Sequence, residues 1–145
     1  MLPKWHVLYG ALFSAFLWLL SPNISLIYLA LTFLASFLID FDHYINSVIK
    51  TKRFSLTHAL EHHKKLGIVE IQEREKGIRK KEPFHLFHTV EFHVLIGILG
   101  IFWIFFFFIF IGIVFHSLLD LFSMIYKDRL YRREFFFFNW LRKNL

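Results

Sequence analysis

Three short clusters of histidine and acidic residues stand beside long apolar segments, and their spacing suits metal binding. They are Asp40, Asp42 and His43; His85, His88 and Glu91; and His116 with Asp120. Residues three or four positions apart share one face of a helix, so each cluster can direct its side chains to one point. Imidazole and carboxylate groups in this pattern are typical ligands of Zn²⁺, Mn²⁺ and Fe²⁺. The chain has no cysteine, which excludes thiolate ligands and disulfides.

The position of these groups next to apolar segments adds a physical argument. An ionisable side chain at lipid depth costs roughly 2.5–3.5 kcal/mol or more unless it is paired or faces a wet cavity. Several such groups lower that cost by sharing a cation. We therefore predict one or two divalent ions, with zinc in first place and manganese or iron as alternatives. The predicted ligands are Asp40, Asp42, His43, His85, His88, Glu91, His116 and Asp120.

The composition indicates a membrane protein. The chain has 145 residues, is 57% hydrophobic and contains 21 phenylalanines. A soluble domain of this size has too much surface to hide so many apolar side chains from water. Lipid is the natural solvent for the excess, so we predict an all-α membrane protein.

Four short transmembrane helices, arranged as two hairpins, are predicted at about 5–20, 24–42, 84–104 and 107–124. Ser-Pro-Asn at 21–23 interrupts the first apolar run, because proline and asparagine favour turns. No glycine, proline or asparagine marks the second turn, which we place near Phe105–Phe108. A single helix through 84–124 is therefore the competing interpretation. A short helix is also predicted from Ser55, as N-cap, to Lys65, followed by a solvated stretch from Glu70 to Glu82.

Charge favours the hairpin. All 17 lysines and arginines lie at Lys4, in the central segment 44–83 or after Tyr126. A hairpin puts them on one side of the membrane, whereas a single span would put the basic tail 126–145 opposite the basic central loop. Positive residues prefer the cytoplasmic side. We expect a prokaryotic inner membrane, both termini and the loop in the cytoplasm, and the tail either on the anionic lipid surface or packed on the bundle. Nucleic acid is not expected as a partner.

With these motifs assigned, the chain resembles the YdjM-type inner-membrane proteins, a family described as membrane-bound metal-dependent hydrolases. Asp-Phe-Asp-His at 40–43 matches the family's first motif, and His-Ser-Leu-Leu-Asp at 116–120 matches its last. In the middle motif, Arg53 and Thr57-His58 follow the family order, but Lys52 stands where the family has histidine. The resemblance implies a multi-helix membrane fold with a hydrolytic metal site.

Three functions are compatible with these residues. The first is a hydrolase acting on a lipid ester or phosphoester at the inner interface, with Glu91 or Asp42 as general base. The second is a di-iron lipid desaturase or hydroxylase, because His-Ala-Leu-Glu-His-His at 58–63 resembles a histidine box. The third is a non-enzymatic metal-binding protein. The sequence leaves open whether His58, His62 and His63 join the site, and we expect His6 to be only interfacial.

Overall fold

The chain folds into helices joined by turns and by two longer connections, 76–85 and 127–136. The computed structural model describes residues 3 to 145, and no β-strand occurs among them. The helices are α1 (Pro3–Leu20), α2 (Leu26–Leu38), α3 (Phe41–Thr51), α4 (Leu56–Glu75), α5 (Val90–Phe102), α6 (Ile104–Tyr126) and α7 (Phe137–Asn144). Two 3-10 turns, η1 (Leu86–His88) and η2 (Leu130–Arg132), complete the structure. The all-α prediction is confirmed.

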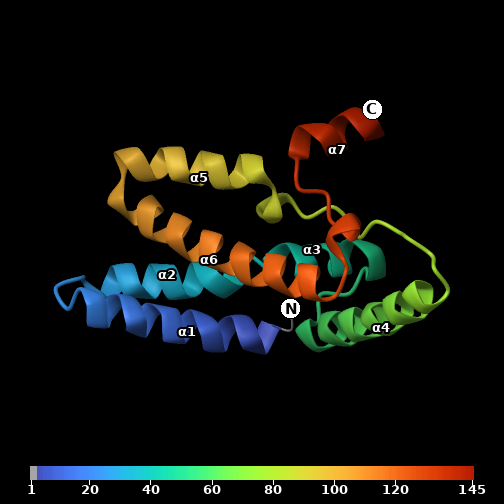
Figure 1. The fold of residues 1–145 in the computed structure, drawn as a ribbon, viewed down its shortest axis with the longest axis horizontal. Coiled ribbons are helices and arrows are strands. Elements are labelled where there is room, and N and C mark those ends of the chain that lie inside the picture. Colours follow the sequence, from blue (N-terminus) through green and yellow to red (C-terminus); the bar gives the residue numbers. More distant parts are fainter. Residues whose placement is uncertain (1–2) are drawn as a thin grey trace.

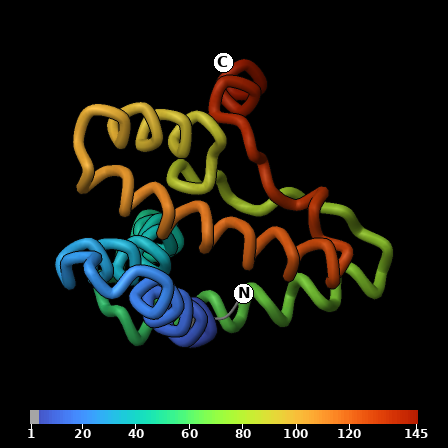
Figure 2. The backbone as a smooth tube through the Cα atoms, turned by 60° about the vertical axis from the view of Figure 1, so that its left-hand side comes forward, coloured from blue at the N-terminus to red at the C-terminus, as the bar shows by residue number. Residues whose placement is uncertain are grey.

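Two antiparallel hairpins make up the apolar part of the molecule. α1 and α2 form the first and α5 and α6 the second, with both hairpin turns at the same end (Figure 1). α6 lies between the first hairpin and α5 in both views (Figures 1 and 2). The other end of the molecule carries α3, α4 and α7. The topology therefore separates an apolar end from an end that holds most of the polar segments.

The second hairpin turns at Trp103, a few residues before the predicted position. Trp103 is extended, with φ −136° and ψ 117°, between two helical neighbours. Gly100 makes this turn possible, because a Cβ there would meet Phe107 Cα at 2.9 Å. The glycine that permits the turn thus precedes it by three residues. The single-helix interpretation of 84–124 is wrong.

Small residues hold the two hairpins together. Thr32 on α2 donates a hydrogen bond from Oγ1 to Phe108 O on α6, at 3.1 Å. One turn further along α6, Gly112 faces Thr32 and Ala35 so closely that no side chain fits between the helices. Such contacts between small residues are the usual way in which helices pack in lipid. Ile39, Ile96 and Ile113 form the small buried apolar core beside them.

The outer faces of the hairpins remain apolar. Leu19, Ile101 and Phe102 are each about 70–80% exposed, and large apolar side chains also face outward along the rest of these helices. Two stretches are long and apolar enough to cross a membrane: Leu26–Thr51, which comprises α2 and α3, and Ile104–Tyr126. α1 and α5 are apolar but shorter.

Two helix boundaries differ from the predicted ones for local reasons. The second predicted helix, 24–42, is divided by a turn at Ile39 and Asp40, so Asp42 and His43 lie in the first turn of α3. The predicted helix 84–104 begins only at Val90, because residues 86–88 form a 3-10 turn and Thr89 caps α5 by accepting from Phe92 N–H. The turn at Ile39 and Asp40 and the 3-10 turn at 86–88 therefore lie beside the buried side chains of Asp42 and His88.

The basic loop and the tail are more ordered than predicted. Ser55 caps α4 as expected, by accepting from His58 N–H, but α4 continues to Glu75. Glu70 is buried rather than solvated, and it forms ion pairs with Arg129 and Arg132 of the tail. The first part of the tail therefore packs on the bundle, and α7 extends away from it at the C-terminus (Figure 1).

Candidate metal centre

A buried cluster of histidines and aspartates lies where the helices converge, away from the hairpin turns. The contributors are α1 (His6), the α2–α3 junction (Asp40, Asp42, His43), η1 with its N-cap (His85, His88) and α6 (His116, Asp120). Four overlapping groups of three among these residues have ligand atoms within 4.8 Å of one another. Seven of the eight predicted ligands thus belong to the cluster, and Glu91 does not.

The centre of the cluster consists of Asp40, His88, His116 and Asp120, which we call the central site. His88 Nε2 and His116 Nε2 are 3.2 Å apart. Asp40 Oδ1 lies 3.6 and 3.5 Å from these two nitrogens. Asp120 Oδ2 lies 4.0 and 3.8 Å from them. Ligands at about 2.0–2.1 Å from a tetrahedral zinc ion lie roughly 3.3 Å apart. The spacings among His88, His116 and Asp40 fit this value, and Asp120 Oδ2 lies somewhat farther out.

The histidine rings are held with Nε2 directed to the central site. His116 donates from Nδ1 to Ser36 O at 2.8 Å, which fixes its ring against α2. His88 donates from Nδ1 to Asp42 Oδ2 at 3.0 Å. A ring whose Nδ1 carries the proton presents the Nε2 lone pair to a metal, and such outer partners orient the ligands of metal sites. Asp42 is therefore a positioning residue for His88.

His43 and His85 lie next to His88, and His43 Nε2 is also 3.5 Å from Asp40 Oδ1 of the central site. Asp42 Oδ1 is 3.4 Å from His85 Nδ1, and the His43 and His85 ring centroids are 3.9 Å apart. Of the histidine box at 58–63, only His63 contacts the cluster, by donating from Nε2 to His43 O at 2.9 Å. His58 and His62 belong to none of the four groups found among residues 3–145.

His6 is the residue that sequence reasoning missed. It is fully buried, and its ring stacks on His116 with centroids 3.9 Å apart. His6 Nε2 lies 3.2 Å from Asp120 Oδ1. The prediction that His6 is only interfacial is wrong. The available signal was an imidazole in the first turns of an apolar helix, where an ionisable group needs a partner.

The guanidinium group of Arg133 contacts the cluster through Asp120. It is buried, and it donates from Nη1 to Asp120 Oδ2 and from Nε to Glu82 Oε1, both at 2.8 Å. Burial lowers the pKa of Arg133, but the two carboxylates outweigh it and raise the pKa above its ordinary value. Asp40, Asp42, Asp120 and Glu82 together carry more negative charge than this one guanidinium can balance. A divalent cation would compensate the excess, so the residues fit a metal.

Glu91 has a different role from the predicted one. Its carboxylate accepts hydrogen bonds from Phe137 N–H at 2.8 Å and Phe138 N–H at 3.3 Å, at the first turn of α7. The predicted ligand and general base is thus an N-terminal cap supplied by α5. His93 is likewise satisfied elsewhere, since Nδ1 donates to Thr89 O and Nε2 accepts from Ser117 Oγ.

Replacing Glu91 by alanine is expected to loosen α7 and to leave metal content unchanged. Loss of a helix N-cap costs about 0.5–2 kcal/mol, and α7 has eight residues. Hydrogen exchange of the Phe137 and Phe138 amides should accelerate by roughly tenfold or more. Metal analysis of the same sample provides the second readout. If the Glu91→Ala protein lost a bound ion, Glu91 would be a metal ligand after all, which would contradict its assignment as a helix cap.

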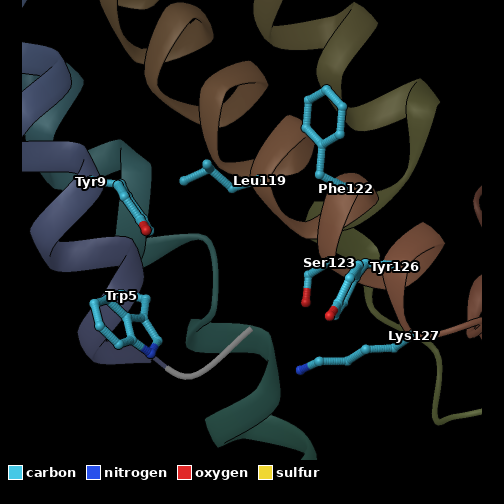
Figure 3. A pocket seen from close by; sticks show the side chains of 7 residues that line it. All are labelled: Trp5, Tyr9, Leu119, Phe122, Ser123, Tyr126 and Lys127. Carbon is cyan, nitrogen blue, oxygen red and sulfur yellow. The ribbon is translucent and has the colours of Figure 1, made fainter.

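An open groove lies between α1 and the C-terminal half of α6. It has a volume of about 450 Å³ and is lined by Trp5, Tyr9, Leu119, Phe122, Ser123, Tyr126 and Lys127 (Figure 3). Trp5 and Leu119 directly precede His6 and Asp120 in the sequence. The groove is mostly apolar, and the Ser123 and Tyr126 hydroxyls and the Lys127 ammonium group stand on its α6 side (Figure 3). Its shape and lining suit an acyl chain with a polar head.

Comparison with known proteins gives no relative to which the site can be compared. No family model, no curated protein and no solved structure matches this chain.

Proposed function

We propose that this protein is a membrane-embedded, metal-dependent hydrolase that acts on a lipid ester or phosphoester. The observation that carries the proposal is the central site, in which two Nε2 atoms and two carboxylates converge at the spacing of metal ligands. The resemblance of Asp-Phe-Asp-His at 40–43 and His-Ser-Leu-Leu-Asp at 116–120 to motifs of the YdjM-type family supports the same activity. The proposal includes four membrane spans, with both termini and the basic segments on the cytoplasmic side of a prokaryotic inner membrane.

The donor set favours zinc and is compatible with manganese or iron. Imidazole and carboxylate ligands bind all three ions, and the chain has no cysteine to favour softer metals. A divalent ion held by Asp40, His88, His116 and Asp120 would lower the pKa of a water molecule and polarise the ester or phosphoryl group.

The chain's own residues would supply proton transfer and charge. Asp40 is the most exposed of the three aspartates, with 17% of its side chain accessible against 7% for Asp42 and 3% for Asp120. It is therefore the carboxylate that incoming water reaches first. Because Oδ1 faces His88 and His116 at the ion position, we propose the other oxygen, Oδ2, as the proton acceptor. Asp42 keeps His88 in the required orientation. Arg133 keeps Asp120 ionised and in place.

The substrate class follows from the surroundings of the site. The groove between α1 and α6 is open and mostly apolar, and the outer faces of both helices carry exposed apolar side chains. An acyl chain would lie along Phe122 and Leu119, and Lys127 would meet an anionic head group. An amphiphile thus suits the site better than a small polar molecule.

A lipid hydrolysis assay tests the proposal. The purified protein would be assayed in mixed micelles with phosphatidic acid and with a diacylglycerol, following release of inorganic phosphate and of fatty acid. Zinc-loaded protein should release one of these products at a rate well above that of chelator-treated protein. No release from either lipid by protein loaded with zinc, manganese or iron would contradict the hydrolase assignment.

In the metal-free protein, the free energy of unfolding is expected to fall as the pH rises from 6.5 to 9. Burial lowers the pKa of His88, but the Asp40 and Asp42 carboxylates outweigh it and raise the pKa from 6.5 to about 9. A raised folded-state pKa contributes stability below pH 6.5, and that stability is lost as the pH passes 9. With saturating zinc the trend should reverse, because the metal requires the deprotonated ring. Thermal unfolding in detergent measures both series, and identical pH trends would contradict the assignment.

A further inference from the structure

We propose that Asp42, His43 and His85 form a second divalent-cation site beside the central one, so that the protein binds two ions. This inference rests on the proposed metal-dependent function and deepens it. The three residues have ligand atoms within 4.8 Å of one another. None of them is among the four ligands assigned to the central site, so the two ligand sets have no residue in common.

The strongest evidence is an unsatisfied carboxylate oxygen. Asp42 Oδ2 accepts from His88, but Asp42 Oδ1 is buried and has no hydrogen-bond partner among the described residues. A buried, unpaired carboxylate oxygen is costly, and a metal ion is one of the few partners that offsets such a cost. Asp42 Oδ1 lies 3.4 Å from His85 Nδ1, which is the spacing of two ligands on one ion.

The environment of His85 indicates that its Nδ1 is a lone-pair donor. Asn46 donates from Nδ2 to Phe84 O at 2.9 Å, which fixes the amide orientation. The same Nδ2 lies 3.2 Å from His85 Nδ1 and thus presents an N–H group to it. Two acceptors, His85 Nδ1 and Asp42 Oδ1, therefore face each other in a buried place. A cation between them would satisfy both acceptors. It would take the single Nδ1 lone pair from the Asn46 N–H group, and Asn46 would keep its hydrogen bond to Phe84 O.

His43 supplies the third ligand from a fixed position. Its ring packs against His85, and its backbone carbonyl accepts from His63 Nε2. The ring nitrogen His43 Nε2 also lies 3.5 Å from Asp40 Oδ1, a ligand atom of the central site. The Asp42 carboxylate connects the two sites, because Oδ2 holds the central ligand His88 while Oδ1 faces the second ion.

Manganese titration of site-specific variants tests this proposal. Full-length protein in detergent would be stripped with chelator and titrated with Mn²⁺, with bound ions counted from the free-manganese electron paramagnetic resonance signal. Wild type should bind two equivalents. His85→Ala, and His85→Gln as a variant of closer volume, should bind one. His62→Ala is the matched control, because His62 lies outside the cluster, and it should bind two.

The outcomes separate this inference from the proposed function. If wild type binds one ion and His85→Ala still binds one, the second site is overturned while the central site stands. If His85→Ala and His85→Gln both bind two ions, the ligand assignment is overturned. If wild type binds none, the metal-dependent function itself fails. A dipolar or exchange-broadened signal in the two-ion wild type, absent from His85→Gln, would add support that a mere packing role for His85 cannot explain.

Discussion

Replacing His116 by alanine is expected to remove the ion of the central site and the hydrolytic activity together. His116 Nε2 lies within 3.8 Å of His88 Nε2, Asp40 Oδ1 and Asp120 Oδ2, so it is adjacent to every other ligand. Loss of an outer partner of a metal ligand typically costs 10–100-fold in affinity. Loss of a ligand should exceed roughly a hundredfold, and hydrolysis should fall to the level of chelated protein.

Metal affinity and lipid hydrolysis measured on the same preparation check this result. His62→Ala removes a histidine outside the four groups and should match wild type in both measurements. His116→Asn keeps a side chain of similar size near Ser36 O, so it distinguishes lost ligation from lost packing. Both variants at position 116 should fail to hold the central ion. Wild-type affinity in either would remove His116 from the site.

Replacing Gly112 by alanine is expected to destabilise the protein and to weaken metal binding from a distance. An added Cβ would meet Thr32 O at 2.4 Å and Ala35 Cβ at 2.8 Å, neither of which can move without a shift of α2. Overpacking of this kind typically costs about 1–3 kcal/mol. Gly112 lies one turn before His116, whose ring is bonded to Ser36 O on α2. Separating α2 from α6 should therefore also disturb the central site.

Replacing a different glycine, Gly67, by alanine should raise the stability of the protein instead of lowering it. A Cβ at Gly67, inside α4, meets no atom within 4 Å. Alanine there should stabilise the helix by about 0.5–1 kcal/mol. Thermal unfolding of the two variants in one detergent gives the comparison. A Gly112→Ala protein as stable as Gly67→Ala would mean that α2 and α6 are not in the close contact described above.

Much of the site could be predicted because its residues occur as local motifs. Asp-Phe-Asp-His places three predicted ligands within four residues, and His-Ser-Leu-Leu-Asp places two within five. The charge distribution correctly favoured a hairpin that brings their helices together. The N-cap role of Ser55 was equally local. Spacing within one helix and charge counted over segments are properties that a single sequence displays directly.

The remaining features depend on contacts between distant segments. His6 and Arg133 reach the cluster from opposite ends of the chain, and no local motif marks either of them. Glu91 has the right helical spacing for a ligand, but its carboxylate accepts a hydrogen bond from the Phe137 amide of α7 instead. The turn at Trp103 was misplaced because the enabling glycine lies three residues earlier, at the point where α5 and α6 approach each other.

Zinc X-ray absorption spectroscopy of the purified, zinc-loaded protein is the most direct test of the central claim that this cluster is a metal site. A first shell of only nitrogen and oxygen ligands at about 2.0–2.1 Å is expected, with outer-shell scattering from imidazole rings. His116→Ala should lose the ion of the central site, so its zinc content per protein and its imidazole scattering should both fall after the same loading and washing, with only the ion at Asp42, His43 and His85 retained. A wild-type protein that retains no zinc, or retains zinc without imidazole scattering, would contradict the account.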